Sequence, residues 1–486
     1  MKLKHLSLSV MIMGSAAGLY ATGAMASGYH FGSQSVSAQG TAFANGAEAN
    51  DASTIFYNPA GMSRLQGNNF SGGLTVVIPD SEYTDKGSKH VTGAATGGNN
   101  GGSFAPSSVV APSLYATHQV NDKVTVGLGI FVPFGAKLDY DSTWAGRYAL
   151  QSISLETLNF NPSVAFKLDE RNSVGVGVSA QYMKAKLSKA VDTAGGLGLL
   201  QSAAAHGSVA AQQQLAAMQR QLLALGMTPT QIQNALAAVQ DGKASLEADG
   251  WGYGFNLGYM FQLDENTRFG LAYRSNIHHK LTGSATWDFS GSSYDPRVAA
   301  LVGAASGHKN SDGSVTVDTP ESISANAFHK LNDKIDLMAD LTWTRHSRMD
   351  SIDIKFDGTT EGDLVIKQKW RDTYKLSLGM NYHYNDALTL RTGVAYDQSP
   401  VDNDNLRHPA LPDSDRYWLS FGANYKLNKQ SSIDFAYSYV FFKNADIKYT
   451  DGCNPLATTC TGNGETTVGS YKTNLQFVGL QYNYSF

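Results

Sequence analysis

The sequence has few charges, only two cysteines and, after its first residues, no long apolar run. Charged residues make up 16% of the 486 residues, against roughly 25% in ordinary soluble proteins. The 37 Lys and Arg nearly balance the 41 Asp and Glu, for a net charge of −4, so there is no basic stripe for nucleic acid. A membrane-spanning helix needs ~18 or more apolar residues in a row, and no such run follows residue 26. These absences exclude a bundle of membrane helices but not a β-barrel.

The first 26 residues have the pattern of a secretory signal peptide. Lys2 and Lys4 precede an apolar or small stretch from Leu6 to Tyr20, and Ala24-Met25-Ala26 supplies small residues for cleavage. A buried N-terminal helix is the alternative. We therefore expect an exported protein whose mature chain starts near Ser27.

The two cysteines, Cys453 and Cys460, lie in a stretch rich in Gly, Thr and Asn. An exported chain meets an oxidising compartment, in which disulfides persist. We therefore expect a small loop disulfide that stiffens this stretch. No His lies near enough in the sequence to complete a metal site with the two thiols, and we expect neither a metal nor a cofactor.

What the chain has instead is glycine, aromatic residues and a period-two pattern. It contains 49 Gly, 24 Tyr and 21 Phe, and from about residue 67 onward apolar side chains alternate with small or polar ones, most clearly in residues 251–261, 433–441 and 478–486. A soluble sandwich would turn its aromatic residues inward and its charges outward. Strands with an apolar outer face, a polar inner face and aromatic girdles are typical of a transmembrane barrel. The pattern therefore predicts an all-β transmembrane barrel.

Tight turns and long loops alternate along the chain and set the number of strands. Asn and Asp suit tight hairpins because they tolerate turn dihedrals and bond their own backbone. Six such turns lie at 121–123, 169–172, 264–266, 332–334, 385–386 and 428–429. Seven longer connections lie near 80–106, 141–153, 189–249, 288–313, 357–363, 400–413 and 445–468. These connections predict fourteen antiparallel strands, with the short turns in the periplasm and the long loops outside the cell.

Residues 27–66 precede the barrel domain, residues 67–486, and do not fit its wall. They are small or polar, with few β-branched side chains, and end in Asn58-Pro59-Ala60-Gly61-Met62. Fourteen strands enclose a space that needs filling, so we expect these residues to form a hatch in the lumen. The alternative is a flexible periplasmic tail.

The loop insert 194–240 has helical periodicity. Leu215, Met218, Leu222 and Leu225 recur at helical spacing. Thr228-Pro229-Thr230-Gln231 is typical of a helix start, and Asp295-Pro296 begins a similar short helix in a second loop. We expect small amphipathic helices in two extracellular loops, packed on each other or on an apolar ligand.

Three prolines fall inside consecutive predicted strands. A strand residue in a closed barrel donates a ladder hydrogen bond, which proline cannot do. Pro112, Pro133 and Pro162 interrupt the second, third and fourth strands, and the middle one lies in Phe131-Val132-Pro133-Phe134-Gly135. One interpretation is a tolerated bulge. The other is an inward kink that opens the wall laterally to the lipid, lined by the two phenylalanines of this segment.

With these features the mature chain resembles, over nearly its whole length, the FadL-type family of long-chain fatty-acid outer-membrane transporters. The motifs that carry the resemblance are Gly28-Tyr29, Asn58-Pro59-Ala60, Thr143–Gly146, Tyr182–Lys186, Ala272–Ser275, Asp372–Tyr374, Arg391–Asp397 with Ser399-Pro400, and Pro412-Asp413 with Asp415–Ser420. The resemblance implies a barrel with an N-terminal hatch, a kinked third strand and uptake of hydrophobic molecules by lateral diffusion. The C-terminal Phe486, shared with most outer-membrane barrels, implies contact with the barrel-assembly machinery.

The resemblance also implies a basic pair that holds the carboxylate of the ligand. These positions fall on Lys189 and Lys367, with Lys369 as an alternative to the second, and the aromatic residue near the mature N-terminus falls on Tyr29. The kink is more apolar than the hydroxyl-bearing versions in the family, which leaves aromatic hydrocarbons as an alternative ligand. Contact with anionic lipopolysaccharide at the rim is an alternative role for the lysines.

Two other classes of protein fit less well. A general porin would share the barrel but would not need roughly forty plugging residues, and charged rings would line its lumen. An outer-membrane enzyme would need a nucleophile, a base and an oxyanion hole, yet there is no G-x-S-x-G motif, and His278-His279 lack metal-ligand spacing. We therefore expect a monomeric transporter of hydrophobic small molecules and not an enzyme.

Overall fold

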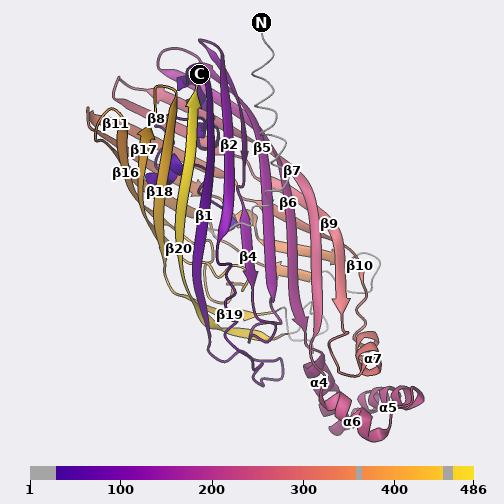
Figure 1. The fold of residues 1–486 in the computed structure, drawn as a ribbon. Coiled ribbons are helices and arrows are strands. Elements are labelled where there is room, and N and C mark those ends of the chain that lie inside the picture. The colour runs from indigo at the N-terminus through magenta and orange to yellow at the C-terminus, as the bar shows by residue number, and fades with distance from the viewer. Residues whose placement is uncertain (1–28, 357–363, 452–463) are drawn as a thin grey trace.

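One antiparallel sheet, closed on itself, forms most of the protein. The computed structural model describes residues 29–356, 364–451 and 464–486. The sheet closes because β1 pairs with both β2 and β20 (Figure 1). Its strands are β1 Asn68–Asp85, β2 Val109–Asn121, β3 Val124–Phe131, β4 Gly135–Asp139, β5 Ser152–Lys167, β6 Asn172–Val191, β7 Gly242–Gln262, β8 Thr267–Arg274, β9 Ile277–Asp288, β10 Ser311–Thr319, β11 Ser322–Asn332, β12 Ile335–Thr344, β13 Ser351–Phe356, β14 Leu364–Lys367, β15 Thr373–His383, β16 Leu388–Asp397, β17 Arg416–Lys426, β18 Ser431–Phe442, β19 Ala445–Thr450 and β20 Thr466–Ser485.

These segments make up fourteen transmembrane strands, because six transmembrane strands are each interrupted once. The interrupted ones are β3/β4, β8/β9, β10/β11, β12/β13, β14/β15 and β18/β19. The predicted fourteen-stranded antiparallel barrel is confirmed. Each of the six predicted tight turns joins two successive strands, starting with the turn between β2 and β3.

Several of the predicted long connections are wrong in their bounds, as where β1 continues to Asp85 inside the predicted connection 80–106. The largest differences lie in two others. β7 begins at Gly242, inside the predicted connection 189–249, and β19 lies inside the predicted connection 445–468. In both places the ladder continues beyond the expected end of the strand. The side chains still alternate there, but apolar residues such as Leu246 and Ile447 are buried and outward residues such as Glu247 are polar, so the apolar outer face ends. The predicted connection 357–363 and the predicted Cys453–Cys460 disulfide lie outside the described residues.

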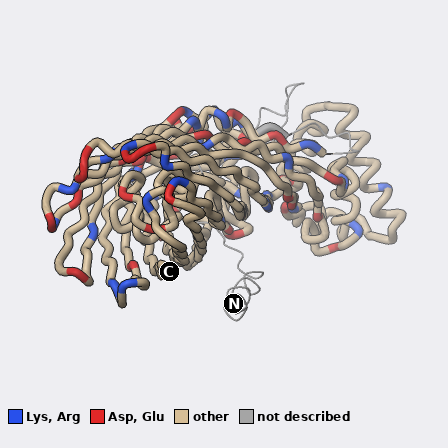
Figure 2. Tube along the Cα trace, turned by 90° about the horizontal axis from the view of Figure 1, so that it is seen from above, with Lys and Arg blue, Asp and Glu red and all other residues tan. Residues whose placement is uncertain are grey.

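The period-two pattern separates an outer face from a luminal face. On β7, Tyr253 is 73% exposed while Asn256 is 2% exposed, and on β18 Phe435 points outward while Asp434 is buried. Seen from above, Lys and Arg are interspersed with Asp and Glu, and neither sign dominates (Figure 2). The barrel therefore presents apolar side chains to lipid and polar ones to its interior.

The long loops carry helices at the end of the barrel opposite the C-terminus (Figure 1). The helices are α4 Thr193–Ala205, α5 Val209–Ala224, α6 Pro229–Ala237 and α7 Pro296–Ser306. Their apolar faces pack on each other through residues that include Met218, Leu222, Ile232 and Val298, whereas Leu225 is 55% exposed. α6 begins with the predicted capping box. Within the described residues no helix is long and apolar enough to cross a membrane.

Candidate functional site: the luminal segment, two cavities and a break in the wall

Residues 29–66 lie inside the barrel. Their helices are α2 Val36–Gly40, α3 Thr54–Tyr57 and the 3-10 helix η3 Pro59–Arg64. α2 contacts β17, β18 and β20, while η3 contacts β5, β6 and β7. Because these two groups of strands lie on different sides of the ring, the segment crosses the lumen.

Polar side chains of the wall hold this segment. Gln481 of β20 accepts a hydrogen bond from the Val36 N–H at 3.0 Å and donates one to Asp51 at 3.2 Å. Asn381 of β15 donates to the Glu48 carboxylate at 2.7 Å. Buried polar groups are stable only when they are hydrogen-bonded. Polar side chains on the luminal face of several strands therefore bind the luminal segment.

The Asn58-Pro59-Ala60 turn is seated against glycines of the wall. Asn58 Oδ1 accepts from the Ala60 N–H and Asn58 Nδ2 donates to the Tyr259 carbonyl, both at 3.1 Å. A Cβ at Gly258 would lie 2.2 Å from Asn58 Oδ1, and one at Gly175 would lie 2.4 Å from the Ala60 nitrogen. The turn therefore fits only where β6 and β7 have no side chain.

The kink between β3 and β4 is bonded to the luminal segment. The Phe31 N–H donates to the Pro133 carbonyl at 2.8 Å, and Gln34 Nε2 donates to the Val132 carbonyl at 2.6 Å. The carbonyls that the kink removes from the β-ladder thus find donors in the lumen.

Next to this kink the ladder of the wall is interrupted. β1 pairs with β2 only as far as Val77↔Val109, and β2 pairs with β3 only as far as Ser113↔Phe131. Among the described residues, β4 forms a ladder with β5 alone, and β1 beyond Val77 forms one with β20 alone. A cavity lies here, with Ser81 of β1 and Lys137 of β4 among its lining residues.

The other two prolines do not divide a strand. Pro112 lies one residue beyond the end of the β2–β3 ladder. At Pro162 two pairs are missing from the β5–β6 ladder, between Phe160↔Ala180 and Ser163↔Gly177, but the register is the same on both sides, so there is no extra residue as in a bulge. Of these three prolines, Pro133 alone separates two strand segments; Pro320 does so elsewhere, between β10 and β11.

A larger cavity lies between the luminal segment and the wall. Its lining includes Phe43, Phe56 and Trp418, and two cations face these rings. Lys375 Nζ lies 4.1 Å from the centre of the Phe43 ring, and the Arg274 guanidinium lies 4.5 Å from that of Phe56. In the described part of the chain neither cation forms an ion pair with a carboxylate. Cations at an aromatic wall suit an anionic headgroup with an apolar tail.

A buried apolar cluster leads from the N-terminal residues to the kinked strand. Tyr29, 3% exposed, packs beside Trp370 with ring centres 5.8 Å apart. The same cluster includes Met183 of β6, Leu246 of β7 and Ala136 of β4. It provides an apolar lining in the lumen up to the segment where the ladder is interrupted.

The structure places the three predicted headgroup lysines apart from the larger cavity. Lys189 Nζ lies 2.8 Å from Asp451 Oδ2, and Lys367 and Lys369 are exposed. Their role toward a ligand stays a prediction. The sequence analysis did not single out Lys375, which directly follows the motif Asp372–Tyr374, or Arg274, which lies within the motif Ala272–Ser275. The signal that could have found them is a cation at an inward-facing position of the period-two pattern.

A closed fourteen-stranded barrel with a lumen crossed by its own N-terminal segment defines the protein as an outer-membrane transport barrel. The model of the family described as "Outer membrane protein transport protein (OMPP1/FadL/TodX)" matches residues 17–486. The chain therefore belongs to this family.

Relatives and solved structures agree with this assignment. An outer membrane protein of Neisseria meningitidis serogroup B is 34% identical over 494 residues, covering 99% of each chain. The long-chain fatty acid transport protein of Escherichia coli O6:H1 is 30% identical, with 97% of each chain covered. The crystal structure of a Pseudomonas aeruginosa FadL homologue covers 95% of this chain and 100% of its own, at 25% identity and a TM-score of 0.77. The Pseudomonas putida toluene transporter TodX, at 19% identity, 90% and 94% coverage and a TM-score of 0.59, shares the fold.

Proposed function

We propose that the protein takes up long-chain fatty acids across the outer membrane and releases them sideways into the lipid between β1 and β4. The observation that carries this proposal is the interrupted ladder beside the cavity that Ser81 and Lys137 line. A hydrocarbon tail that leaves the lumen through the wall keeps about 0.8 kcal/mol per methylene that an exit into water would lose. The relatives named as long-chain fatty acid transport proteins support this ligand class.

Aromatic hydrocarbons are the second candidate ligand. The aromatic lining of the larger cavity and the apolar kink favour them, and the fold is shared with toluene transporters. The cations Lys375 and Arg274 favour a carboxylate instead, because neither forms an ion pair within the described residues, although Asp340 and Asp397 line the same cavity and offset part of the charge of Lys375.

The proposal assigns a task to each part of the chain. Residues 1–26 direct export, and residues 27–66 act as a hatch that blocks the lumen to ions. Residues 67–486 form the barrel, with the insert 194–240 on its outer side. Contacts with lipopolysaccharide at the rim, recognition of Phe486 by the barrel-assembly machinery, a monomeric state and the absence of catalysis belong to the same proposal.

Uptake of radiolabelled oleate by cells that lack their own importer tests the proposed transport. We expect accumulation of oleate and low ion conductance of the purified barrel in planar bilayers. Leakage of small sugars with no oleate accumulation would establish a general porin in place of the proposed transporter.

A pair of ligands tests where the headgroup binds. Oleate and oleyl alcohol differ in charge, so Lys375→Met should weaken oleate binding by about 10- to 100-fold and leave oleyl alcohol binding nearly unchanged, as expected for a lost charge-assisted hydrogen bond. Lys189→Met, Lys367→Met and Lys369→Met test the sites implied by the family in the same assay. Lys334→Met, in a tight turn, is the control. Equal oleate affinity for wild type and Lys375→Met would remove the larger cavity as the headgroup site.

A further inference from the structure

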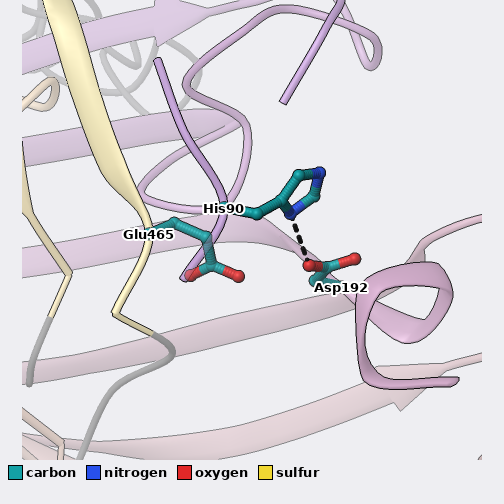
Figure 3. Close-up of side chains that lie close together, drawn as sticks. All are labelled: His90, Asp192 and Glu465. Carbon is teal, nitrogen blue, oxygen red and sulfur yellow. Dashed lines mark hydrogen bonds and ion pairs between the residues drawn. The ribbon is translucent and has the colours of Figure 1, made fainter. Parts of the chain in front are cut away.

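Three chain segments that are far apart in sequence meet at the outer end of the barrel. His90 lies in the connection after β1, Asp192 between β6 and α4, and Glu465 directly before β20. One ligand atom from each side chain lies within 4.8 Å of one from both of the others (Figure 3).

Backbone pairing sets this arrangement. Lys89 and Thr466 form an antiparallel bridge, with both N–H···O=C bonds between 2.8 and 2.9 Å. The next pair in this register is His90 with Glu465, whose side chains therefore share one side. Asp192 is the N-cap of α4: its Oδ1 accepts from the Gly195 N–H at 2.7 Å, while its Oδ2 lies 2.7 Å from His90 Nδ1.

The group has more carboxylates than cations. Glu465 is 5% exposed, and its Oε2 has no hydrogen-bond partner within the described part of the chain. Burial, followed by the negative charges of Asp451 and Asp192, raises the pKa of Glu465 to about 7. The ammonium of Lys189 is held at 2.8 Å by Asp451. A buried carboxylate normally has a hydrogen bond, a cation or a metal as its partner, and Glu465 Oε2 has none of these among the described residues.

We propose that His90, Asp192 and Glu465 form a binding site for a divalent transition-metal ion of the Zn²⁺ type, completed by water. An imidazole with two carboxylates is a ligand set that such ions accept. Tetrahedral zinc with bonds of about 2.1 Å separates its ligand atoms by about 3.4 Å, so rotations of the side chains close the 4.8 Å spacing. The ion takes the place of the proton between His90 and Asp192 and gives Glu465 its missing partner.

Such an ion would add a common link to three loops that are otherwise joined by the Lys89–Thr466 bridge and the His90–Asp192 hydrogen bond. It links the β1–β2 connection and the residue before β20 to the start of α4, and so fixes the helical insert relative to the outer mouth of the barrel. The site is distinct from the luminal cavities, because its three residues line neither of them.

Metal titration of tag-free, chelator-treated protein tests the site. We expect calorimetry to give one Zn²⁺ per chain, and Co²⁺ to give the visible absorption bands of a tetrahedral site. Glu465→Gln and His90→Gln should each weaken binding by at least about tenfold, the lower end of what losing a supporting group costs. His278→Gln is the matched control, since His278 pairs with Asp318 at 2.9 Å but belongs to no such three-residue group in the described chain.

Folding and location are checked in the same preparations. Heat-modifiable gel mobility identifies folded variants, and Asp192→Asn provides a third variant if one of the others fails to fold. Zn²⁺ should slow proteolysis of the helical insert in wild type and in His278→Gln, but not in Glu465→Gln. Absence of Zn²⁺ binding by wild type, or unchanged affinity in folded Glu465→Gln, would overturn the assignment.

Discussion

The wall between β6 and β7 and the wall between β1 and β4 differ in continuity. The β6–β7 ladder runs without a jump from Asn172↔Phe261 to Val191↔Gly242. On the other side, the β2–β3 ladder ends at Ser113↔Phe131, and β4 pairs only with β5 among the described residues. β6 and β7 contain no proline, whereas prolines flank the end of the interrupted ladder on both of its strands.

The comparison shows what an interruption of a closed barrel requires. A missing donor alone is tolerated, because at Pro162 the β5–β6 ladder lacks two pairs and then continues in the same register. At Pro133 the freed carbonyls also have other donors, Phe31 and Gln34, from the luminal segment. The same segment is seated on the glycines of the continuous wall, so it contacts both regions and couples them.

The largest expected effect comes from closing the interruption. Cysteines at Ser81 and Lys137, joined by a short dithiol crosslinker in a Cys453→Ser/Cys460→Ser background, should abolish oleate uptake and leave oleate binding intact, because neither residue lines the larger cavity. Cysteines at Ser188 and Ser245, which are partners in the continuous β6–β7 ladder, should have no effect when crosslinked. Normal uptake by the crosslinked Ser81/Lys137 variant would make passage through the hatch the better account.

A smaller effect is expected from crowding the seat on the continuous wall. Gly258→Val places atoms where Asn58 lies, and such overpacking costs up to about 3 kcal/mol. The luminal segment should shift, and the ion conductance of the barrel in planar bilayers should rise. Gly196→Ala, where an added Cβ would meet nothing within 4 Å, is the control. Unchanged conductance in Gly258→Val would show that residues 29–66 are not what blocks the lumen.

The third prediction concerns the donors at the kink. Gln34→Ala leaves the Val132 carbonyl without its side-chain donor, at a cost of about 2 kcal/mol. We expect this cost to appear as roughly 30-fold faster hydrogen exchange of residues 29–35. Gln119→Ala, which removes an exposed bond to the Gly67 N–H, should leave this exchange unchanged. Equal protection of residues 29–35 in Gln34→Ala and wild type would contradict the proposed link between the segment and the kink.

The smallest effect is a pH dependence in an outer loop. His408 is 3% exposed, and burial lowers its pKa to about 4. Between pH 6.5 and 4 the opened loop takes up a proton that the packed loop does not, so the stabilisation is complete above pH 6.5 and is lost as the pH falls. At pH 5.5 the loss is about 1.4 kcal/mol, or tenfold in the population of the opened loop. Proteolysis of loop 400–413 should measure it, and the dependence should vanish in His408→Gln but persist in His206→Gln.

The strand count was predictable because turn chemistry and alternation are local properties of the sequence. The interruptions within strands were harder to predict. β8 and β9 separate at Ser275-Asn276 without a proline. There the Ser275 hydroxyl accepts a hydrogen bond from the Phe255 N–H of the neighbouring strand. A side chain that replaces a backbone acceptor in this way pairs with a residue that is distant in sequence, so local sequence patterns do not reveal it.

The luminal cations show a similar limit. Arg391 and Lys375 both occupy inward positions of the alternation, yet Arg391 is paired with Asp434 and Lys375 has no ion pair among the described residues. Only the arrangement of the strands around the ring distinguishes a structural cation from one that is free for a ligand. The family resemblance located other lysines because it follows motifs, which say nothing about which carboxylates lie nearby.

The seam between β1 and β20 sets the order of events during assembly. The ladder runs from Asn69↔Ser485 to Asp85↔Gly469, so it joins the first and last strands of the barrel and cannot form before the whole chain has been delivered. α2 contacts both strands of this seam, while η3 contacts β5 to β7. We therefore expect the luminal segment to be enclosed while the seam is still open, with the pairing of β1 and β20 as the last step of folding.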